Sequence, residues 1–321
     1  MKQLFFLLTF LSYFTLLSAQ TKPEIAFTLE EKNLIPEGIA YNAVDKSFYV
    51  GSIYKKKIVQ ITADGKVSDF ISSGADEIEQ VLGMKVDARG FLWACNNTSE
   101  HDTVNRISNV HVYDLHTKKM VKRFKLVDDR VHLFNDLYIT KNGDVFITDT
   151  QASMLWVVRR DSKTLEEFTK PGSLMWANGI TASQDEKHLL VSTTGSLGIA
   201  MVDIQTKAIT PLLNDRYRMM GFDGLYRYNN ILIGVQNTFF PESIQKIVMT
   251  PDNRRAEKVD FLGESDSLFN IPTTGVLADG YFYFIANSQL LQIIGSSQGK
   301  IKDPEKLEDI IIMKIKLNEV Y

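Results

Sequence analysis

The chain has 321 residues, a formal charge of −3 and one cysteine, and 23% of its residues are charged. No basic patch with interleaved aromatic residues occurs, which excludes the usual signature of a nucleic-acid partner. The single cysteine excludes an intramolecular disulfide. Cys95 ends the apolar run at residues 91–95, a setting typical of core packing rather than of a reactive nucleophile.

The first segment predicts export. Lys2 precedes an apolar stretch at residues 4–11, and the small residues Ser18 and Ala19 come just before Gln20. A positive start, a short apolar core and a small residue before a polar one indicate a signal peptide at 1–19, hence a secreted or periplasmic protein. The alternative is an N-terminal membrane anchor. No second long apolar run follows, so we expect residues 20–321 to form one domain without a membrane span.

Six repeats organise the rest of the chain. Each has a polar or special residue, usually glycine next, then a short apolar strand, a turn and a second strand. The repeats open at positions 37, 82, 135, 178, 223 and 274, so the spacings are 45, 53, 43, 45 and 51 residues. This is the period of a four-stranded propeller blade. The sequence therefore predicts an all-β fold, a six-bladed β-propeller with a central channel.

The last blade requires a strand from the other end of the chain. The sixth repeat supplies strands at residues 274–286 and 309–315, with a surface loop expected at 296–307. We expect residues 24–29 to provide its outermost strand. This clasp would pair edges that otherwise stay open.

The repeat openings predict a cation site on the propeller axis. The innermost strand of each blade begins near the axis, so these residues face one another in a ring: Glu37, Leu82, Asn135, Asn178, Asp223 and Thr274. The next position is glycine in five repeats and Asp136 in the third, as expected where backbones crowd together. The alternative is that the polar residues are turn formers at strand starts.

The donor types favour calcium. Glu37, Asn135, Asn178 and Asp223 offer only oxygens, without histidine or cysteine, and a roomy site with carboxamide oxygens suits Ca²⁺ better than Mg²⁺. Two carboxylates converging in a poorly hydrated channel would also be costly without a cation. We expect one ion in this ring, and a second, structural ion deeper in the channel is possible.

Around these residues the chain resembles a known superfamily. The segments at 36–38, 134–137, 177–180 and 222–225 are similar to those of the calcium-dependent propellers that include gluconolactonase, regucalcin (senescence marker protein), luciferin-regenerating-enzyme-like proteins, diisopropyl-fluorophosphatase and the paraoxonases. The resemblance covers residues 25 to 320. It implies that Glu37, Asn135 and Asn178 hold the ion, while Asp223 also acts as nucleophile or general base. The ion would stabilise a developing oxyanion.

One departure concerns histidine. The paraoxonases carry a catalytic histidine where this chain has Leu82, so a histidine dyad of that type is doubtful here. His132 lies three residues before Asn135, and we expect it to be a surface or hydrogen-bonded structural residue rather than a base.

Other residues bear on the substrate. We expect Asp136 and Thr274 near the metal ligands. Phe134, Trp176 and Phe222, with Met84, are candidates for the channel mouth, although packing inside the blades is the more common fate of such apolar side chains. An apolar mouth favours a lactone or ester with a hydrophobic body. Four arginines are candidates for binding an acidic group but have no predicted place: Arg89, Arg106, Arg218 and Arg227.

Two functions follow from this interpretation. The first is a calcium-dependent hydrolase of small lactones or esters, expected to be monomeric. The second is a non-catalytic secreted propeller that binds a ligand or a partner and uses calcium as a structural plug, because fold alone does not settle function. Asn96 opens an N-glycosylation sequon, which matters only for a eukaryotic source.

Overall fold

The computed structural model describes residues 22–99, 102, 106–126, 128–195, 197–214, 219–296 and 299–317. The predicted signal peptide at 1–19 and Arg218 lie outside these residues. Within the described ranges, none of the helices combines the length and apolar character needed to cross a bilayer.

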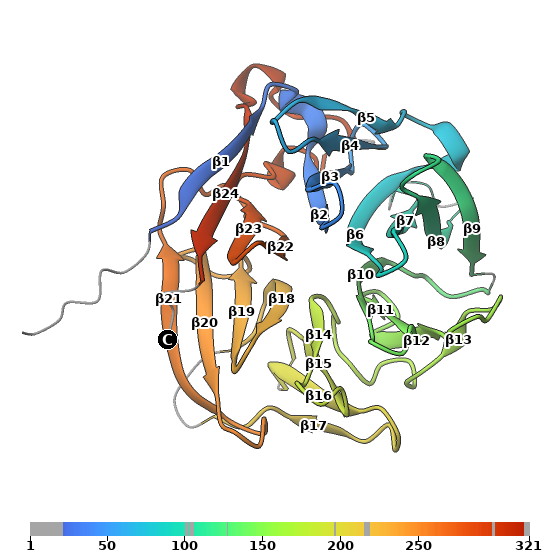
Figure 1. Ribbon diagram of the computed structural model, residues 1–321, viewed down its shortest axis with the longest axis vertical. Coiled ribbons are helices and arrows are strands. Elements are labelled where there is room, and N and C mark those ends of the chain that lie inside the picture. Colours follow the sequence, from blue (N-terminus) through green and yellow to red (C-terminus); the bar gives the residue numbers. More distant parts are fainter. Residues whose placement is uncertain are drawn as a thin grey trace, which may run out of the picture.

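Six antiparallel sheets of four strands each form the molecule, and they stand around a common centre with the strand that opens each repeat innermost (Figure 1). The first three blades are β2 (Pro36–Asn42), β3 (Ser47–Ser52), β4 (Lys57–Ile61) and β5 (Val67–Ile71); β6 (Gln80–Val86), β7 (Phe91–Asn97), β8 (Ser108–Asp114) and β9 (Lys119–Lys125); and β10 (Phe134–Ile139), β11 (Val145–Asp149), β12 (Met154–Val158) and β13 (Glu166–Glu167). The next two are β14 (Ile180–Ala182), β15 (His188–Ser192), β16 (Ile199–Asp203) and β17 (Ile209–Pro211); and β18 (Phe222–Tyr228), β19 (Ile231–Gln236), β20 (Ser243–Met249) and β21 (Ala256–Glu264). The predicted six-bladed propeller is confirmed.

The sixth blade is built from both ends of the chain. It contains β22 (Gly275–Ala278), β23 (Tyr281–Ile285) and β24 (Ile310–Lys316), and β1 (Glu24–Leu29) completes it as the outermost strand. Leu29 pairs with Ile310 and Glu24 with Lys314, and the Lys314 ammonium lies 3.3 Å from the Glu24 carboxylate. The predicted clasp is therefore confirmed, to the residue, at 24–29.

Apolar side chains on the strands fill the spaces between neighbouring blades. Among the described residues, six hydrophobic clusters occur, and five of them join the facing sides of two adjacent blades. The sixth lies between blades two and three and also contains Ile35, Ile53, Ile293 and Leu307. The clasp lies in one of the clusters, where Leu29 packs with Val50 of the first blade and with Ile310 and Ile312 of the last. Because side chains alternate between the two faces of each strand, every blade buries one face against each of its two neighbouring blades. The hydrophobic core therefore runs continuously around the ring.

The innermost strands are irregular at one shared place. In blades one, two, three and five the pairing between the first and second strands shifts just where the repeat opens, for example between Phe134 and Leu137. A β-bulge of this kind re-aims side chains at a strand end. It is the local feature that separates Asn135, facing the axis, from Phe134, packed within the blade.

Close backbone approach explains the glycines that follow the ring positions. A Cβ on Gly38 would lie 2.0 Å from the Leu82 carbonyl oxygen, and one on Gly179 would lie 2.5 Å from the Leu225 nitrogen. Neither contact is possible for a side chain, so crowding near the axis demands glycine here. The predicted reason for the repeated glycine is confirmed.

Candidate metal centre and cavity

The channel opens at one end into a cavity of about 1240 Å³. Its lining includes all four predicted donors, which come from four different blades: Glu37, Asn135, Asn178 and Asp223. Leu82, at the opening of the second repeat, lines the same cavity as an apolar member of the ring. Side chains up to 186 positions apart in sequence therefore meet at one place, as the repeat spacing predicts.

Three of these four residues carry an oxygen that lacks a hydrogen-bond partner. Glu37 Oε2, Asn135 Oδ1 and Asn178 Oδ1 are all buried, and none has a partner among the described residues. A buried polar atom without a partner costs on the order of 1–3 kcal/mol. Three such oxygens, on residues that line one cavity, form a set of donors that suits a hard cation.

The surroundings of the Glu37 and Asp223 carboxyl groups disfavour their charged forms. Burial, together with the charges of Asp223 and Asp136, raises the pKa of Glu37 well above its ordinary value. Burial also raises the pKa of Asp223 to about 6, against the hydrogen bonds that it accepts from Asn237 and Asn178. Both shifts show that negative charge is disfavoured here without a compensating positive group.

Two residues that sequence reasoning missed hold the ring in place. The Asn237 amide donates to Asp223 Oδ2 at 2.7 Å and to the Pro272 carbonyl at 2.9 Å. The Asn135 amide donates to Thr150 Oγ1 at 3.1 Å, which leaves its oxygen directed elsewhere. Thr150 and Asn237 each follow directly after the second strand of their blade, beside the opening of the first. The hairpin register was the signal that would have identified them.

Asp136 and Thr274, both expected near the ligands, make structural contacts and do not line the cavity. Asp136 is fully buried, and its Oδ1 lies 3.0 Å from the Lys85 ammonium. The Thr274 hydroxyl donates to the Glu37 carbonyl, as does the Thr273 hydroxyl at 3.1 Å. These hydrogen bonds join blade six to blade one beside the ring.

The expectation that aromatic side chains ring the mouth is correct for only one residue. Trp176 lines the cavity and is 53% exposed. Phe134 and Phe222 are fully buried inside the clusters between blades, and so is Met84, so for these three the mouth placement is wrong. Each of the two phenylalanines precedes the bulge, where the side chain points into the blade.

The cavity lining is mixed, because charged side chains occur in it beside exposed apolar ones; the cationic residues that line it include Lys55, Lys56, Arg106, Arg130 and Lys300. Val131, Leu291 and Ile294 line the cavity together with Trp176, and each is at least 45% exposed. Leu291 and Ile294 belong to the segment between β23 and β24, which includes the loop expected at 296–307. Its composition did not reveal that this segment reaches the cavity.

Among the three candidate arginines that the structure describes, Arg89, Arg106 and Arg227, only Arg106 lines the cavity. Arg89 pairs with Asp87 at 2.8 Å, and the Arg227 guanidinium donates to Asn253 at 2.6 Å. Cys95 is fully buried, and burial raises the pKa of its thiol well above the ordinary value, as expected of a core residue. The sequon asparagine, Asn96, is 2% exposed, so it is a core residue rather than a surface acceptor.

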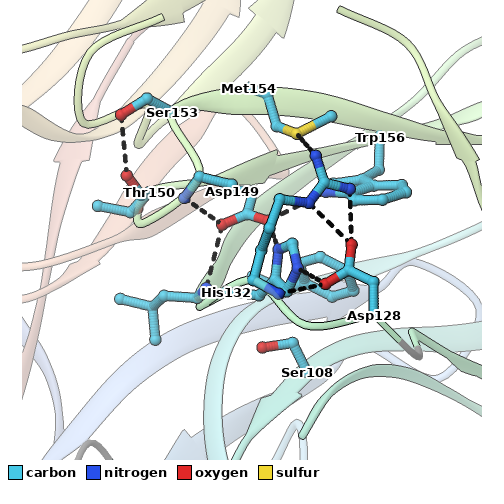
Figure 2. Close-up of polar contacts among 12 residues, drawn as sticks. Ser108, Asp128, His132, Asp149, Thr150, Ser153, Met154 and Trp156 are labelled. Atoms are coloured by element: carbon cyan, nitrogen blue, oxygen red, sulfur yellow. Dashed lines mark hydrogen bonds and ion pairs between the residues drawn. The ribbon is translucent and has the colours of Figure 1, made fainter. Parts of the chain in front are cut away.

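His132 is held between two carboxylates at the edge of the cavity (Figure 2). Its Nδ1 lies 2.5 Å from Asp149 Oδ2, and its Nε2 lies 2.7 Å from Asp128 Oδ1. Burial lowers the pKa of His132, but the hydrogen bonds to these carboxylates outweigh it and raise the pKa above the ordinary value. With both nitrogens engaged, His132 has the structural role that the sequence favoured.

The donor set at the ring is distinctive. Within the described part of the chain, no three side chains of His, Cys, Asp or Glu gather in a way that could hold a metal ion. A metal site in the cavity therefore depends on the amide oxygens of Asn135 and Asn178 as much as on the carboxylates.

Solved structures with the same fold are numerous. The chain is similar to a gluconolactonase from Xanthomonas campestris, with 15% identity over 92% of this chain and 94% of that one and a TM-score of 0.60. It is similar to virginiamycin B lyase from Staphylococcus aureus, with 13% identity over 92% and 100% of the two chains and a TM-score of 0.61. A third is a PQQ-bound aldose sugar dehydrogenase from Streptomyces coelicolor, with 10% identity over 92% and 98% and a TM-score of 0.64.

These likenesses confirm the fold that the sequence motifs implied, and at such identities they show the fold alone. Their names also cover three different chemistries, so the fold does not choose among them. No family model matches the chain, and no curated protein does.

Proposed function

We propose that this chain is a calcium-dependent hydrolase of the gluconolactonase type that acts on lactones or esters. The observation that supports it most is the group of three buried, unpartnered oxygens on Glu37, Asn135 and Asn178, residues that line the same cavity as Asp223. A divalent cation bound there would give these oxygens a partner and neutralise two carboxylates whose pKa values burial raises. The predicted signal peptide would bring the chain to a compartment rich in calcium.

The chain's own residues have distinct roles in this proposal. Glu37, Asn135, Asn178 and Asp223 would hold the ion, which when bound supplies positive charge against a developing oxyanion. Asp223 also borders the cavity, where Asn237 fixes its carboxylate. As a general base it takes a proton from a water molecule, whose oxygen then bonds to the carbonyl carbon; the ester C–O bond breaks, and the leaving alcohol oxygen takes the proton back from Asp223. As a nucleophile its own oxygen bonds to the carbonyl carbon while the ester C–O bond breaks and the leaving alcohol oxygen takes a proton from water; a water molecule then hydrolyses the acyl–Asp223 anhydride and frees the acid.

The test is hydrolysis of a panel of lactones and aryl esters, measured with calcium and after chelation. We expect activity to disappear on chelation and to return with calcium. Asp223→Asn should lower kcat by about 100-fold or more, since a positioned base contributes at least that much. Asp161→Asn is the matched control, because Asp161 is exposed and does not line the cavity. Full activity of folded Asp223→Asn would rule out the role assigned to Asp223.

The exposed apolar side chains in the cavity lining, with Trp176 among them, favour a substrate with a hydrophobic body. Trp176 has a backbone φ of 53°, a left-handed conformation that glycine adopts without strain, so Trp176→Gly removes the ring with little effect on folding. We expect KM to rise about tenfold for esters with a large apolar group, as the loss of a buried aromatic contact implies, and to stay nearly unchanged for a small polar lactone. Equal effects on both substrates would contradict this assignment. A change in tryptophan fluorescence on entry of the ligand that is lost in Trp176→Gly comes from Trp176, since Trp93 and Trp156 are still present in that variant.

A second candidate is a binding propeller in which calcium is a structural plug. Leu82 favours it, because the second position of the ring contributes no polar group to the cavity. His132 also favours this alternative, since both of its ring nitrogens already contact carboxylates and neither is free to act as a base. Under this alternative, chelation lowers the melting temperature while no member of the panel is hydrolysed.

A further inference from the structure

Asp136 is the exception among the residues that follow the ring. The other five repeats have glycine at this position, and the structure gives Asp136 no exposure at all. Its Oδ1 accepts from the Leu137 amide at 2.8 Å and contacts the Lys85 ammonium at 3.0 Å, while its Oδ2 accepts from the Ile180 amide at 3.4 Å. One carboxylate from blade three thus links blades two and four beneath the ring.

Lys85 supplies the positive charge at this level of the channel. Its side chain is 21% exposed, and its ammonium lies 5.4 Å from the centre of the Tyr226 ring in blade five. The Tyr226 hydroxyl in turn accepts from the Gly275 amide of blade six at 2.7 Å. Lys85, Asp136 and Tyr226 therefore form a floor to the ring, tied to blades on opposite sides of the axis.

The charges of the ring and the floor act on each other. Asp136 raises the pKa of both Glu37 and Asp223, so the three carboxylates lie within electrostatic reach. When all three carboxyl groups are ionised, as they would be around a bound cation, their three negative charges and the ammonium of Lys85 leave a net charge of −2. One divalent cation in the ring neutralises that charge completely, and a second would leave it positive.

We propose that the Lys85 ammonium neutralises Asp136 in place of a second metal ion and so limits the channel to one divalent ion, which the ring holds. This inference rests on the proposed calcium site. Lys85 is a positioning residue in it, because its ammonium acts on the ion through Asp136 and does not line the cavity.

The test counts calcium ions per chain by equilibrium dialysis, with folding checked by circular dichroism. We expect one ion in the wild type. Lys85→Met removes the ammonium but keeps an apolar stem of similar length, so Asp136 should recruit a second ion. Asp136→Asn should instead weaken the single site about tenfold or more, because the Lys85 charge is then uncompensated. The double variant removes a neutral pair, so one ion with wild-type affinity, within about threefold, should return. Lys119→Met, on an exposed position of the same blade, is the control.

Three outcomes overturn the proposal: two ions in the wild type, a folded Lys85→Met chain that binds one ion with unchanged affinity, or a double variant that no longer binds calcium. If Lys85→Met does not fold, the calcium affinities of Asp136→Asn and of the double variant test the proposal without it. A wild type that binds no calcium contradicts the proposed function, whereas a wild type that binds two contradicts this inference alone. Hydrolytic activity does not enter the measurement.

Discussion

At the scale of single residues, Glu37 and Asp223 combine burial with like charge. The pKa of each is raised above its ordinary value, with burial as the largest cause. For a carboxyl group, a raised pKa in the folded state means that stability is lost as the pH rises from the unfolded value, near 4, through the folded value, about 6 for Asp223. At pH 7 and without calcium, both groups therefore oppose folding.

This argument predicts a reversal of stability on metal binding. In a chelator at pH 7, Glu37→Gln and Asp223→Asn should each be more stable than the wild type by about 1–3 kcal/mol, because a buried charge is removed. With saturating calcium the order should reverse, since only the wild type keeps the full donor set. Urea unfolding in both conditions measures it, with Asp161→Asn as the neutral reference. Variants that stay less stable than the wild type in chelator would show that these carboxylates have another partner.

At the scale of elements, ion pairs hold residues 128–133, the segment that leads into β10, in place. His132 bridges Asp128 and Asp149, and the Arg130 guanidinium contacts Asp128 at 2.6 Å and Glu167 at 2.5 Å. Burial raises the pKa of Asp128, but hydrogen bonds from His132 and Arg130 outweigh it and lower the pKa to about 2. The pairs thus position Val131 and Leu133, which line the cavity.

The pH dependence of this fastening follows from the raised pKa of His132. A histidine whose pKa is higher in the folded state stabilises the protein fully below its unfolded value, near 6.5, and this contribution is lost as the pH rises through the folded value. We expect His132→Gln to cost about 1–3 kcal/mol at pH 6 and progressively less at higher pH. Urea unfolding between pH 6 and 9 tests this, and the exposed His116 provides the control variant His116→Gln. A cost that is constant with pH would show that the imidazole is held as a neutral group.

The sequence predicted the elements better than the directions of their side chains. Repeats at regular spacing indicate where each inner strand begins, since every blade repeats the same geometry, and this was enough to bring Glu37, Asn135, Asn178 and Asp223 together. The repeat spacing did not predict the side-chain directions of Phe134 and Phe222, because a β-bulge decides which side chain at a strand end faces the axis. Thr150 and Asn237 were missed for a related reason. Their place depends on hairpin register, which residue type alone does not fix.

At the scale of the whole molecule, the clasp converts a row of blades into a closed ring. Leu29 is 2% exposed and lies between the first and last blades, with Val50 on one side and Ile310 on the other. Without β1, the edge of β24 would present unpaired backbone groups.

We therefore expect Leu29→Ala to lower the free energy of unfolding by about 2–4 kcal/mol, as large-to-small changes in a core do. Ile25→Ala, on the same strand but at a position 52% exposed, should have little effect. Urea unfolding of both variants checks the prediction. Equal effects would show that β1 contributes through its backbone alone.

The position of β1 also sets an order of events during biosynthesis. Residues 24–29 leave the ribosome well before their partner residues 310–316. The nascent chain can pair strands within its first five blades, but β1 has no partner strand until residues 310–316 have emerged. A premature stop shortly before residue 310 therefore removes the joint of the ring as well as a strand.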